Sequence, residues 1–486
     1  MSRLLAIGVA VILALTGCVD QQKEVQLYRS VYEKGLPKPE PLESGQTLAL
    51  EQALLLANSD NEQIASQGET YLQALISKRR AFAAFLPTVN AQPNFTVEQA
   101  PKGNAAPAAP GAPAQSAAAA AASQGGFVQD GGILRRLEVP IDGNFDFSAQ
   151  AIPLYQAANL IVVQQRQLLL DTRATILLNV AQTYYEVLIA VQQVAVLQHS
   201  LALQQARVRD LQARLNMRLA MRLDVSQALS NEAATRVQLS EAQNDERNAR
   251  RTLALLIGSA QVDGPLVNSV VADDPPEAVK YYVDRAIAGR QDVQAAHAAV
   301  EAAQQAVKAA IGEYYPSVSL NVAGFLYREN FADATKWDGI LLATIPIFSA
   351  GTIKADVRTA WSRLRQAALA ESYLRRSVDQ AVRTAYDNLA TTGTKLADLR
   401  REVETASLAY AEAIEEEKNG LAIPLDVLTA QDTLLNAQLQ YANQAFTRTI
   451  DRLDLIRVTG DLDPLTPEHL HWTPAPPPNQ FSGQFH

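Results

Sequence analysis

The sequence predicts a mainly helical protein with a small β part, built from a duplicated unit of long antiparallel helices. Three observations predict this fold. From Leu154 to Ile257 the chain contains no proline or glycine, the two residues that break helices most reliably. The same order of motifs returns about two hundred residues later. Short segments of alternating apolar and polar residues lie between the helices of each copy, as expected of strands with one apolar face.

Composition argues against several classes of function. The 486 residues are 48% apolar and carry a net charge of −9, which argues against nucleic acid as a partner. The single cysteine excludes an intrachain disulfide, and with five scattered histidines it offers little material for a metal site. No grouping of nucleophile, base and oxyanion donors is visible, so we expect neither an enzyme nor a cofactor.

Residues 1–17 are typical of an export signal: Arg3, a short apolar run and small residues before Cys18. The Leu15-Thr16-Gly17-Cys18 segment resembles a bacterial lipoprotein signal, in which the cysteine becomes the acylated, palmitate-carrying first residue. Because Val19 rather than aspartate follows Cys18, this resemblance implies delivery to the outer membrane. Residues 18–46 would then be a lipid-anchored N-terminal segment. The alternative is an ordinary signal peptide with an incidental cysteine.

We assign the first copy to residues 47–258 and the second to 278–460, with a linker at 259–277 and a Pro-rich tail at 461–486. Alternation predicts strands at 88–98 and 135–147 in the first copy and at 316–327 and 337–347 in the second. A low-complexity stretch at 101–126, rich in Ala, Pro, Gly and Ser, reads as a loop inserted in the first copy only.

The predicted strands have about the 9 to 11 residues that a tilted strand needs to cross a bilayer. Four strands cannot close a membrane barrel, and open edges in lipid would leave backbone groups unpaired at several kcal/mol each. The chain is therefore expected to share a barrel with copies of itself. The alternative is that the hairpins remain in water and the chain is a lipid-anchored periplasmic coiled-coil scaffold or adaptor without a channel.

The helical segments are roughly 100 Å long at 1.5 Å per residue, so they must project beyond the membrane and fold back. The fold-backs are predicted at 216–222 and 418–424, where Gly420 can adopt positive φ and Pro424 suits a first helical turn. The final helix has a heptad seam. Its apolar members are Leu425, Leu428, Leu435, Leu439, Ala442, Phe446, Leu453 and Ile456.

The two copies align at constant offsets. Val180 and Tyr184 match Val382 and Tyr386, and Leu223-Asp224-Val225 matches Leu425-Asp426-Val427, both at 202 residues. Phe147 matches Phe348 at 201, and the region upstream of the strands matches at 229. Such an alignment describes one duplicated unit rather than a repeat array.

This arrangement resembles the TolC family of outer-membrane efflux channels. The likeness rests on Tyr314-Tyr315-Pro316-Ser317-Val318-Ser319 before a strand, on residues 175–190, and on the Leu-Asp-Val motif after each fold-back. It covers Leu48 to Gly460 and implies a homotrimer with one shared 12-stranded transmembrane β-barrel and a periplasmic α-barrel. It also implies a periplasmic adaptor (membrane fusion protein) and an inner-membrane transporter as partners, with outer-membrane lipid around the barrel.

The resemblance also implies functional residues at the helix tips. Asp426 would help to form a constricted periplasmic mouth. Members of the family have a second aspartate three residues later, but this chain has Thr429 at that position. Asp224 would bond across helices to hold the mouth closed, with Arg218, Arg222 and Lys418 as candidate partners. For both aspartates the alternative is a helix cap.

Two further sets of tip residues are candidates. Glu415, Glu416 and Glu417 could form an acidic collar near the mouth, or a solvated helix face. The residues expected to contact the adaptor are Leu219, Ala220, Leu223, Gly420, Leu421 and Leu425. The sequence carries no signal for the transported substrate.

Overall fold

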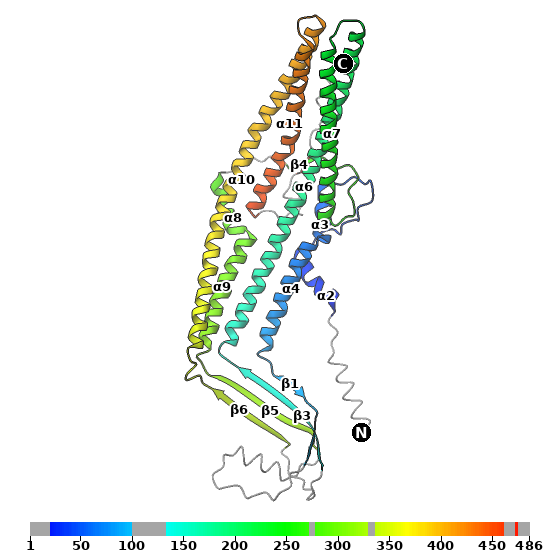
Figure 1. Ribbon diagram of the computed structural model, residues 1–486. Coiled ribbons are helices and arrows are strands. Elements are labelled where there is room, and N and C mark those ends of the chain that lie inside the picture. The colour runs from blue at the N-terminus through cyan, green and yellow to red at the C-terminus, as the bar shows by residue number, and fades with distance from the viewer. Residues whose placement is uncertain (1–19, 100–132, 272–277, 329–335, 461–471, 475–486) are drawn as a thin grey trace, which may run out of the picture. The chain divides into compact units, whose positions relative to one another are not determined.

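The computed structural model describes residues 20–99, 133–271, 278–328, 336–460 and 472–474 (Figure 1). They form two compact units. The first contains the described residues up to Leu72, Gln164–His297 and those from Ala370 onward. The second contains the described parts of Gln73–Val163 together with those of Ala298–Leu369. We describe each unit by itself.

The helices of the two copies correspond one to one. The first copy has α3 (Leu50–Asp60), α4 (Glu62–Ala83), α6 (Ala151–Asn216) and α7 (Arg222–Leu256), and the second has α8 (Val279–Gly289), α9 (Gln291–Gly312), α10 (Thr352–Lys418) and α11 (Pro424–Val458). Equivalent helices have 11, 22 and 35 residues in both copies, except that α6 has 66 residues and α10 has 67. The extra residue in α10 explains why equivalent residues of the two copies are 201 positions apart at the start of these helices and 202 positions apart at their ends. Helix α2 (Gln21–Tyr32) precedes the first copy.

The second unit contains the main antiparallel sheet. Its strands are β1 (Thr88–Ala91), β2 (Asn94–Gln99), β3 (Ile133–Phe147), β5 (Ser317–Arg328) and β6 (Trp337–Thr344), in the order β1-β3-β5-β6 with β2 also on β3. β1 and β2 share one register against β3, since Thr88 pairs with Asn144 and Asn94 with Glu138. They are one strand interrupted at Pro93, whose missing N–H breaks the ladder.

Several strand ends differ from the predicted ranges by one to three residues. β2 ends at Gln99, one residue late, and β5 runs from Ser317 to Arg328 instead of 316–327. β3 begins at Ile133, two residues before the expected start. β6 ends at Thr344 rather than at Ile347, because Pro346 has no N–H to continue the ladder. Pro140 lies at a register shift between β3 and β5, where a β-bulge accommodates it.

A second sheet joins two short segments of the first unit. β4 (Ser269–Val271) pairs antiparallel with β7 (Trp472–Pro474), so Val271 lies opposite Trp472. Sequence analysis assigned these residues to the linker and the tail. Three-residue strands are too short for a period of two to be recognised.

The core of the first unit is centred on α6. Tyr184 and Tyr185 are fully buried, and the Tyr184 hydroxyl lies 2.9 Å from the carbonyl oxygen of Leu48 and 2.7 Å from that of Val267. Tyr185 stacks on Phe446 of α11, with ring centroids 6.1 Å apart. The buried members of the predicted seam on α11 are Leu428, Leu435, Ala442, Phe446 and Leu453.

Candidate functional site

The two fold-backs have the same backbone geometry. After α6, the Leu219 N–H donates to the Arg214 carbonyl (2.8 Å) and the Arg218 N–H to that of Leu215 (2.9 Å). After α10, Leu421 and Gly420 make the equivalent bonds to Glu416 and Glu417. Both are Schellman turns, which need one residue at positive φ.

The residue at positive φ differs between the two turns. Gly420 has φ 73° and Arg218 has φ 62°. A residue with a Cβ atom is strained in this region, by roughly 1–2 kcal/mol. The first turn therefore keeps the geometry of the second at a cost in stability.

Asp224 and Asp426 each cap the helix that follows a turn. The Oδ2 atom of Asp224 accepts a hydrogen bond from the Met221 N–H at 2.9 Å, and that of Asp426 accepts one from the Ile423 N–H at 3.0 Å. Both carboxylates lie in the first turn of a helix, where the helix dipole favours negative charge. Asp224 is buried, with 7% of its surface exposed, whereas Asp426 is exposed. Of the two, Asp426 therefore presents its charge to solvent.

The candidate partners of Asp224 do not pair with it within one chain. Among the described residues, no ion pair joins Asp224 to Arg218, Arg222 or Lys418, and Lys418 instead pairs with Glu415 at 3.2 Å. The proposed bond across helices stays a prediction.

The three glutamates near the end of α10 have different environments. Glu415 and Glu416 are exposed. Glu417 is buried, and its Oε1 atom lies 2.5 Å from Nη2 of Arg207 and 3.3 Å from Nη1 of Arg214, both on α6. An acidic collar would therefore consist of Glu415 and Glu416, because the charge of Glu417 is balanced inside the helix packing.

Sequence analysis missed the Arg207–Glu417–Arg214 cluster. It is extended by Asp210, whose Oδ2 atom lies 3.0 Å from Nε of Arg214. Glu417 lies about two hundred residues along the chain from the other members. The second copy has no equivalent set of charges, since Ala409 stands where Arg207 does in the first. No local pattern could have indicated it.

Most of the predicted adaptor-contacting residues are exposed. The exposed fractions are 73% for Leu219, 60% for Leu223, 80% for Leu421 and 47% for Leu425. Gly420 is also exposed, whereas Ala220 packs partly against a cluster that includes Leu211 and Leu428. Adjacent exposed apolar side chains at both turns are typical of a surface that another protein covers.

The main sheet has one apolar and one polar face, because directly paired residues share a face. On one face Phe145 of β3 pairs with Leu320 of β5, which pairs with Leu341 of β6. On the other, Asn144 lies between Thr88 of β1 and Asn321 of β5. Ile340 and Leu342 of β6 are the apolar exceptions on the polar face, opposite Asn321 and Ser319. The apolar face is exposed within one chain, for example Leu341 at 70%.

Several predictions fall outside the described residues: lipidation at Cys18, the insertion at 101–126 and most of the tail at 461–486. Within the described part of the chain, no group of three or more His, Cys, Asp or Glu side chains could hold a metal ion. One described helix, α6, contains an 18-residue window apolar enough to cross a membrane, and 67% of that window is buried inside the structure. Such burial is typical of a core helix.

Comparison with known proteins supports the resemblance to outer-membrane efflux channels. Residues 282–461, nearly the whole second copy, match the family described as "Outer membrane efflux protein". The outer membrane efflux protein BepC of Brucella suis biovar 1 (strain 1330) is 28% identical over 219 residues, which are 44% of this chain and 47% of that protein. The chain thus matches about half the length of this relative.

Solved structures with the same fold include two outer-membrane proteins. VceC of Vibrio cholerae, an outer membrane protein, superposes with a TM-score of 0.71 at 19% identity, covering 85% of this chain and 96% of that one. The CmeC outer membrane channel of Campylobacter jejuni superposes at 0.72 with 16% identity, covering 89% and 91%. The predicted fold class is confirmed by these similarities.

Proposed function

We propose that this chain is the outer-membrane exit duct of a tripartite efflux pump. Its second copy matches the outer membrane efflux protein family, and its fold is that of solved outer-membrane channels. It would passively conduct small molecules delivered by an inner-membrane transporter and a periplasmic adaptor. Such a duct needs no catalytic group, since its selectivity comes from the charge and width of its pore.

The two-faced sheet carries this proposal. Its apolar face suits lipid and its polar face suits a water-filled lumen. Of the strands described, β6 pairs only with β5, and β1 and β2 pair only with β3, so both edges of the sheet are open. Open edges are not tolerated in lipid. Three chains would contribute twelve strands to one closed barrel, which leaves no edge unpaired.

The long helices support the same assignment. α6 and α10 have 66 and 67 residues, far more than the ~20 that cross a bilayer. With the strands in the outer membrane, these helices would extend into the periplasm and end at the two fold-backs. The exposed leucines there, Leu219, Leu223, Leu421 and Leu425, would contact the adaptor.

At the mouth of the duct we assign Asp426 the main electrostatic role. Its carboxylate is exposed and caps α11, and three-fold symmetry would place three such charges around one opening. Asp224 would act between helices instead, with Arg218, Arg222 or Lys418 of a neighbouring chain as its candidate partners. Glu415 and Glu416 would add negative charge nearby.

The N-terminus would be acylated at Cys18, which adds a second attachment to the outer membrane. The barrel would hold the protein far more firmly than acyl chains do. A Cys18→Ser variant is therefore expected to lose acylation and still insert its strands.

Reconstitution in planar bilayers tests the function directly. We expect stepwise channel conductance and a heat-modifiable, trimer-sized species in outer-membrane extracts. Exclusively monomeric protein in mild detergent, with no conductance, would reject the duct and favour the lipid-anchored scaffold.

A further inference from the structure

Strand β6 is apolar on both faces of the main sheet. Ile340, Leu341 and Leu342 follow one another in it, so Leu341 lies on the apolar face and its two neighbours lie on the polar one. Ile340 is 59% exposed and Leu342 is 54% exposed within one chain. Their direct partners on β5, Asn321 and Ser319, are polar. Ile340 and Leu342 thus form an apolar strip, the β6 strip, between polar neighbours.

Pairing within the sheet does not cover the β6 strip. The row of the sheet that contains Leu342 continues through Ser319 to Asp146 of β3. The row that contains Ile340 reaches Asn144 of β3. Because the directly paired residues of both rows are polar, the exposed apolar area of the strip has no apolar partner opposite it in the described part of the sheet.

Carboxylates lie on the same face beside the strip. Asp338 comes two residues before Ile340 on β6, about 7 Å along the strand. Asp142 of β3 lies in the same row of the sheet as Asp338. Asp146 lies in the row of Leu342, roughly 10 Å away across two strand spacings. In the described part of these rows, the charged side chains are all carboxylates.

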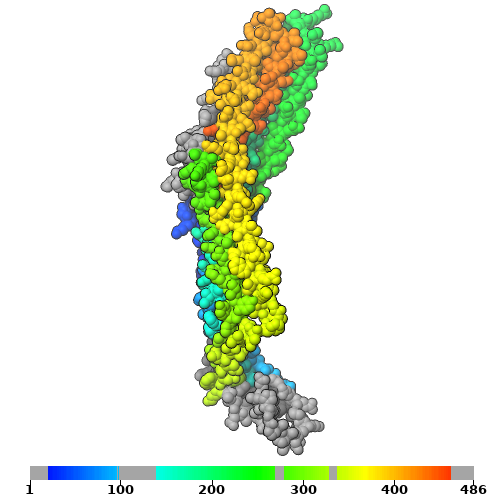
Figure 2. All heavy atoms as spheres, turned by 90° about the vertical axis from the view of Figure 1, so that its left-hand side faces the viewer, coloured from blue at the N-terminus to red at the C-terminus, as the bar shows by residue number. Residues whose placement is uncertain are grey.

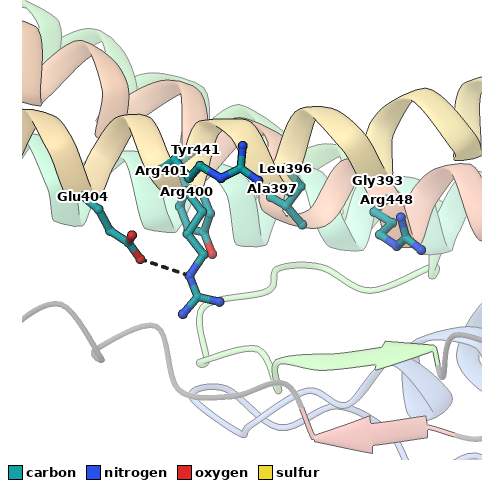
Figure 3. A pocket seen from close by; sticks show the side chains of 8 residues that line it. All are labelled: Gly393, Leu396, Ala397, Arg400, Arg401, Glu404, Tyr441 and Arg448. Atoms are coloured by element: carbon teal, nitrogen blue, oxygen red, sulfur yellow. Dashed lines mark ion pairs between the residues drawn. The ribbon is translucent and has the colours of Figure 1, made fainter.

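Arginines gather on a different surface, which belongs to the first unit. An open hollow of about 410 Å³ between α10 and α11 is lined by Arg400, Arg401 and Arg448 together with Glu404 (Figure 3). Figure 2 shows the upper part of α10 and the adjoining α11 as an open surface. On balance this hollow repels an organic cation, whereas the carboxylates of the sheet attract one. The preference for cations therefore belongs to the polar face of the sheet.

We propose that the β6 strip is a contact site for amphipathic organic cations inside the duct, with Asp338 beside the cationic group and Ile340 and Leu342 against the apolar part. The inference rests on the proposed trimeric duct, in which the polar face of the sheet lines the lumen, and it names a substrate class that this lumen favours. Three-fold symmetry would repeat the strip around the lumen. Weak, repeated contacts suit conduction, since a cargo molecule must enter and also leave.

Both parts of the site are needed to select this class of molecule. Apolar area buried against Ile340 and Leu342 favours alkyl or aromatic groups, by up to roughly fourfold in affinity for each buried CH₂ group. The carboxylates of Asp338, Asp142 and Asp146 attract positive charge and repel negative charge at the same place. A small inorganic cation gains only from the carboxylates, and an alkyl anion gains only from the strip. An amphipathic cation gains from both.

Block of the channel current tests the site in the full-length trimer in planar bilayers. The probes are tetramethylammonium, butyltrimethylammonium and hexyltrimethylammonium, with hexyl sulfate as the anion of matched chain length. We expect the dissociation constant of block to fall by roughly threefold or more at each lengthening of the chain. Hexyl sulfate should block roughly tenfold more weakly than the hexyl cation, because the carboxylates repel it.

Substitutions on the polar face assign the effect to the strip. Ile340→Asn/Leu342→Ser gives each position the residue of its β5 partner. It should abolish the dependence on chain length and leave block by tetramethylammonium unchanged. Asp338→Asn should weaken block by all three cations and keep the dependence on chain length. Asn321→Leu adds an apolar side chain opposite Ile340 and should steepen that dependence. Because Asn321→Leu keeps the strip intact, it tests the site even if the double variant fails to insert.

Conductance separates this inference from the proposed function. If the trimer conducts and its block does not depend on chain length, or depends on it equally in Ile340→Asn/Leu342→Ser, the strip is not a cargo contact and the duct stands. A double variant that only raises the unblocked conductance would make the strip a hydrophobic constriction, which also overturns the contact site. Absence of conductance from the purified protein rejects the duct, and the site with it.

Discussion

The Oε1 atom of Glu417 lies 2.5 Å from Nη2 of Arg207, and this contact ties the end of α10 to α6 close to both fold-backs. The glutamate side chain is 4% exposed and that of Arg207 is 10% exposed. A buried ion pair of this kind is not strong evidence of net stabilisation, but removal of one partner leaves the other charge buried and uncompensated.

Glu417→Ala is therefore expected to destabilise the tip by about 3 kcal/mol, because Arg207 and Arg214 lose their shared carboxylate. Hydrogen exchange of the backbone amides around 205–225 and 410–425 measures the effect. The control is Arg401→Ala, which removes an exposed pair with Asp398 and should change stability by less than about 1 kcal/mol. Equal exchange rates in Glu417→Ala and wild type would show that the cluster does not hold the tip.

The turn after α6 predicts an unusual stabilising substitution. Arg218→Gly removes a Cβ atom at φ 62° and should raise stability by about 1 kcal/mol. Gly420→Ala introduces a Cβ atom at φ 73°, where no heavy atom lies within 4 Å, so the loss of about 1 kcal/mol would come from the backbone alone. Thermal unfolding in detergent should show Tm changes of opposite sign, and a lower Tm for Arg218→Gly would contradict this reasoning.

Two substitutions of Asp426 separate the effect of its charge from its effect as a helix cap. Asp426→Asn removes the charge and keeps an oxygen that can accept the Ile423 N–H, so we expect a shifted reversal potential with little loss of stability. Asp426→Ala should show the same shift and lose about 1 kcal/mol through the missing cap. Bilayer recordings under a salt gradient, paired with thermal unfolding, measure the two effects. Asp224→Asn is the comparison: because Asp224 is buried, its charge should contribute less to the reversal potential than that of Asp426, and loss of its proposed bond between helices should appear as a higher open probability.

Neighbouring residues of β5 test which face of the sheet meets lipid. Leu320→Lys puts a charge on the apolar face and should cost roughly 2–4 kcal/mol near the bilayer centre, which would lower the yield of inserted protein. Asn321→Lys puts the same charge on the polar face and should insert normally while shifting ion selectivity. Membrane fractionation and conductance measure both outcomes, and equal insertion of the two variants would argue against a membrane barrel.

The stability of α11 should depend on pH through Asp454. Burial, together with the nearby Asp451, raises the pKa of its carboxyl, although Arg457 and Arg290 oppose this. A raised pKa in the folded state contributes stability below the usual value of about 3.9, and that contribution is lost as the pH rises through the folded-state pKa. Asp454→Asn should therefore raise Tm at pH 7, with a difference that shrinks toward about pH 4. A constant difference across this range would assign the effect to packing.

Local patterns predicted much of this fold. The alternation along Phe145 and Phe147 identified an apolar strand face, and Gly420 and Pro424 located the second fold-back, because these signals depend only on near neighbours in the chain. The hydroxyl contacts of Tyr184 with Leu48 and Val267 were not predicted, since they join segments far apart in the sequence.

The candidate site was less predictable because identical motifs have different surroundings. Asp224 and Asp426 lie in the same Leu-Asp-Val triplet, yet one is buried and the other exposed. The difference arises from helix packing, in which Leu428 of the second copy covers the first fold-back near Val225. Similarly, three adjacent glutamates in α10 gave no indication that Glu417 alone would be buried.

The single extra residue of α10 limits how the two halves of the gene could have exchanged material after duplication. One residue turns a helix by about 100°, so its insertion redirects every side chain that follows. A recombinant that moved the end of α6 into α10 at the wrong offset would turn the side chains of the following turns away from their packing positions. Crossovers would be tolerated in the shorter equivalent helices, because their lengths agree. Within α6 and α10, whose lengths differ, they would be selected against.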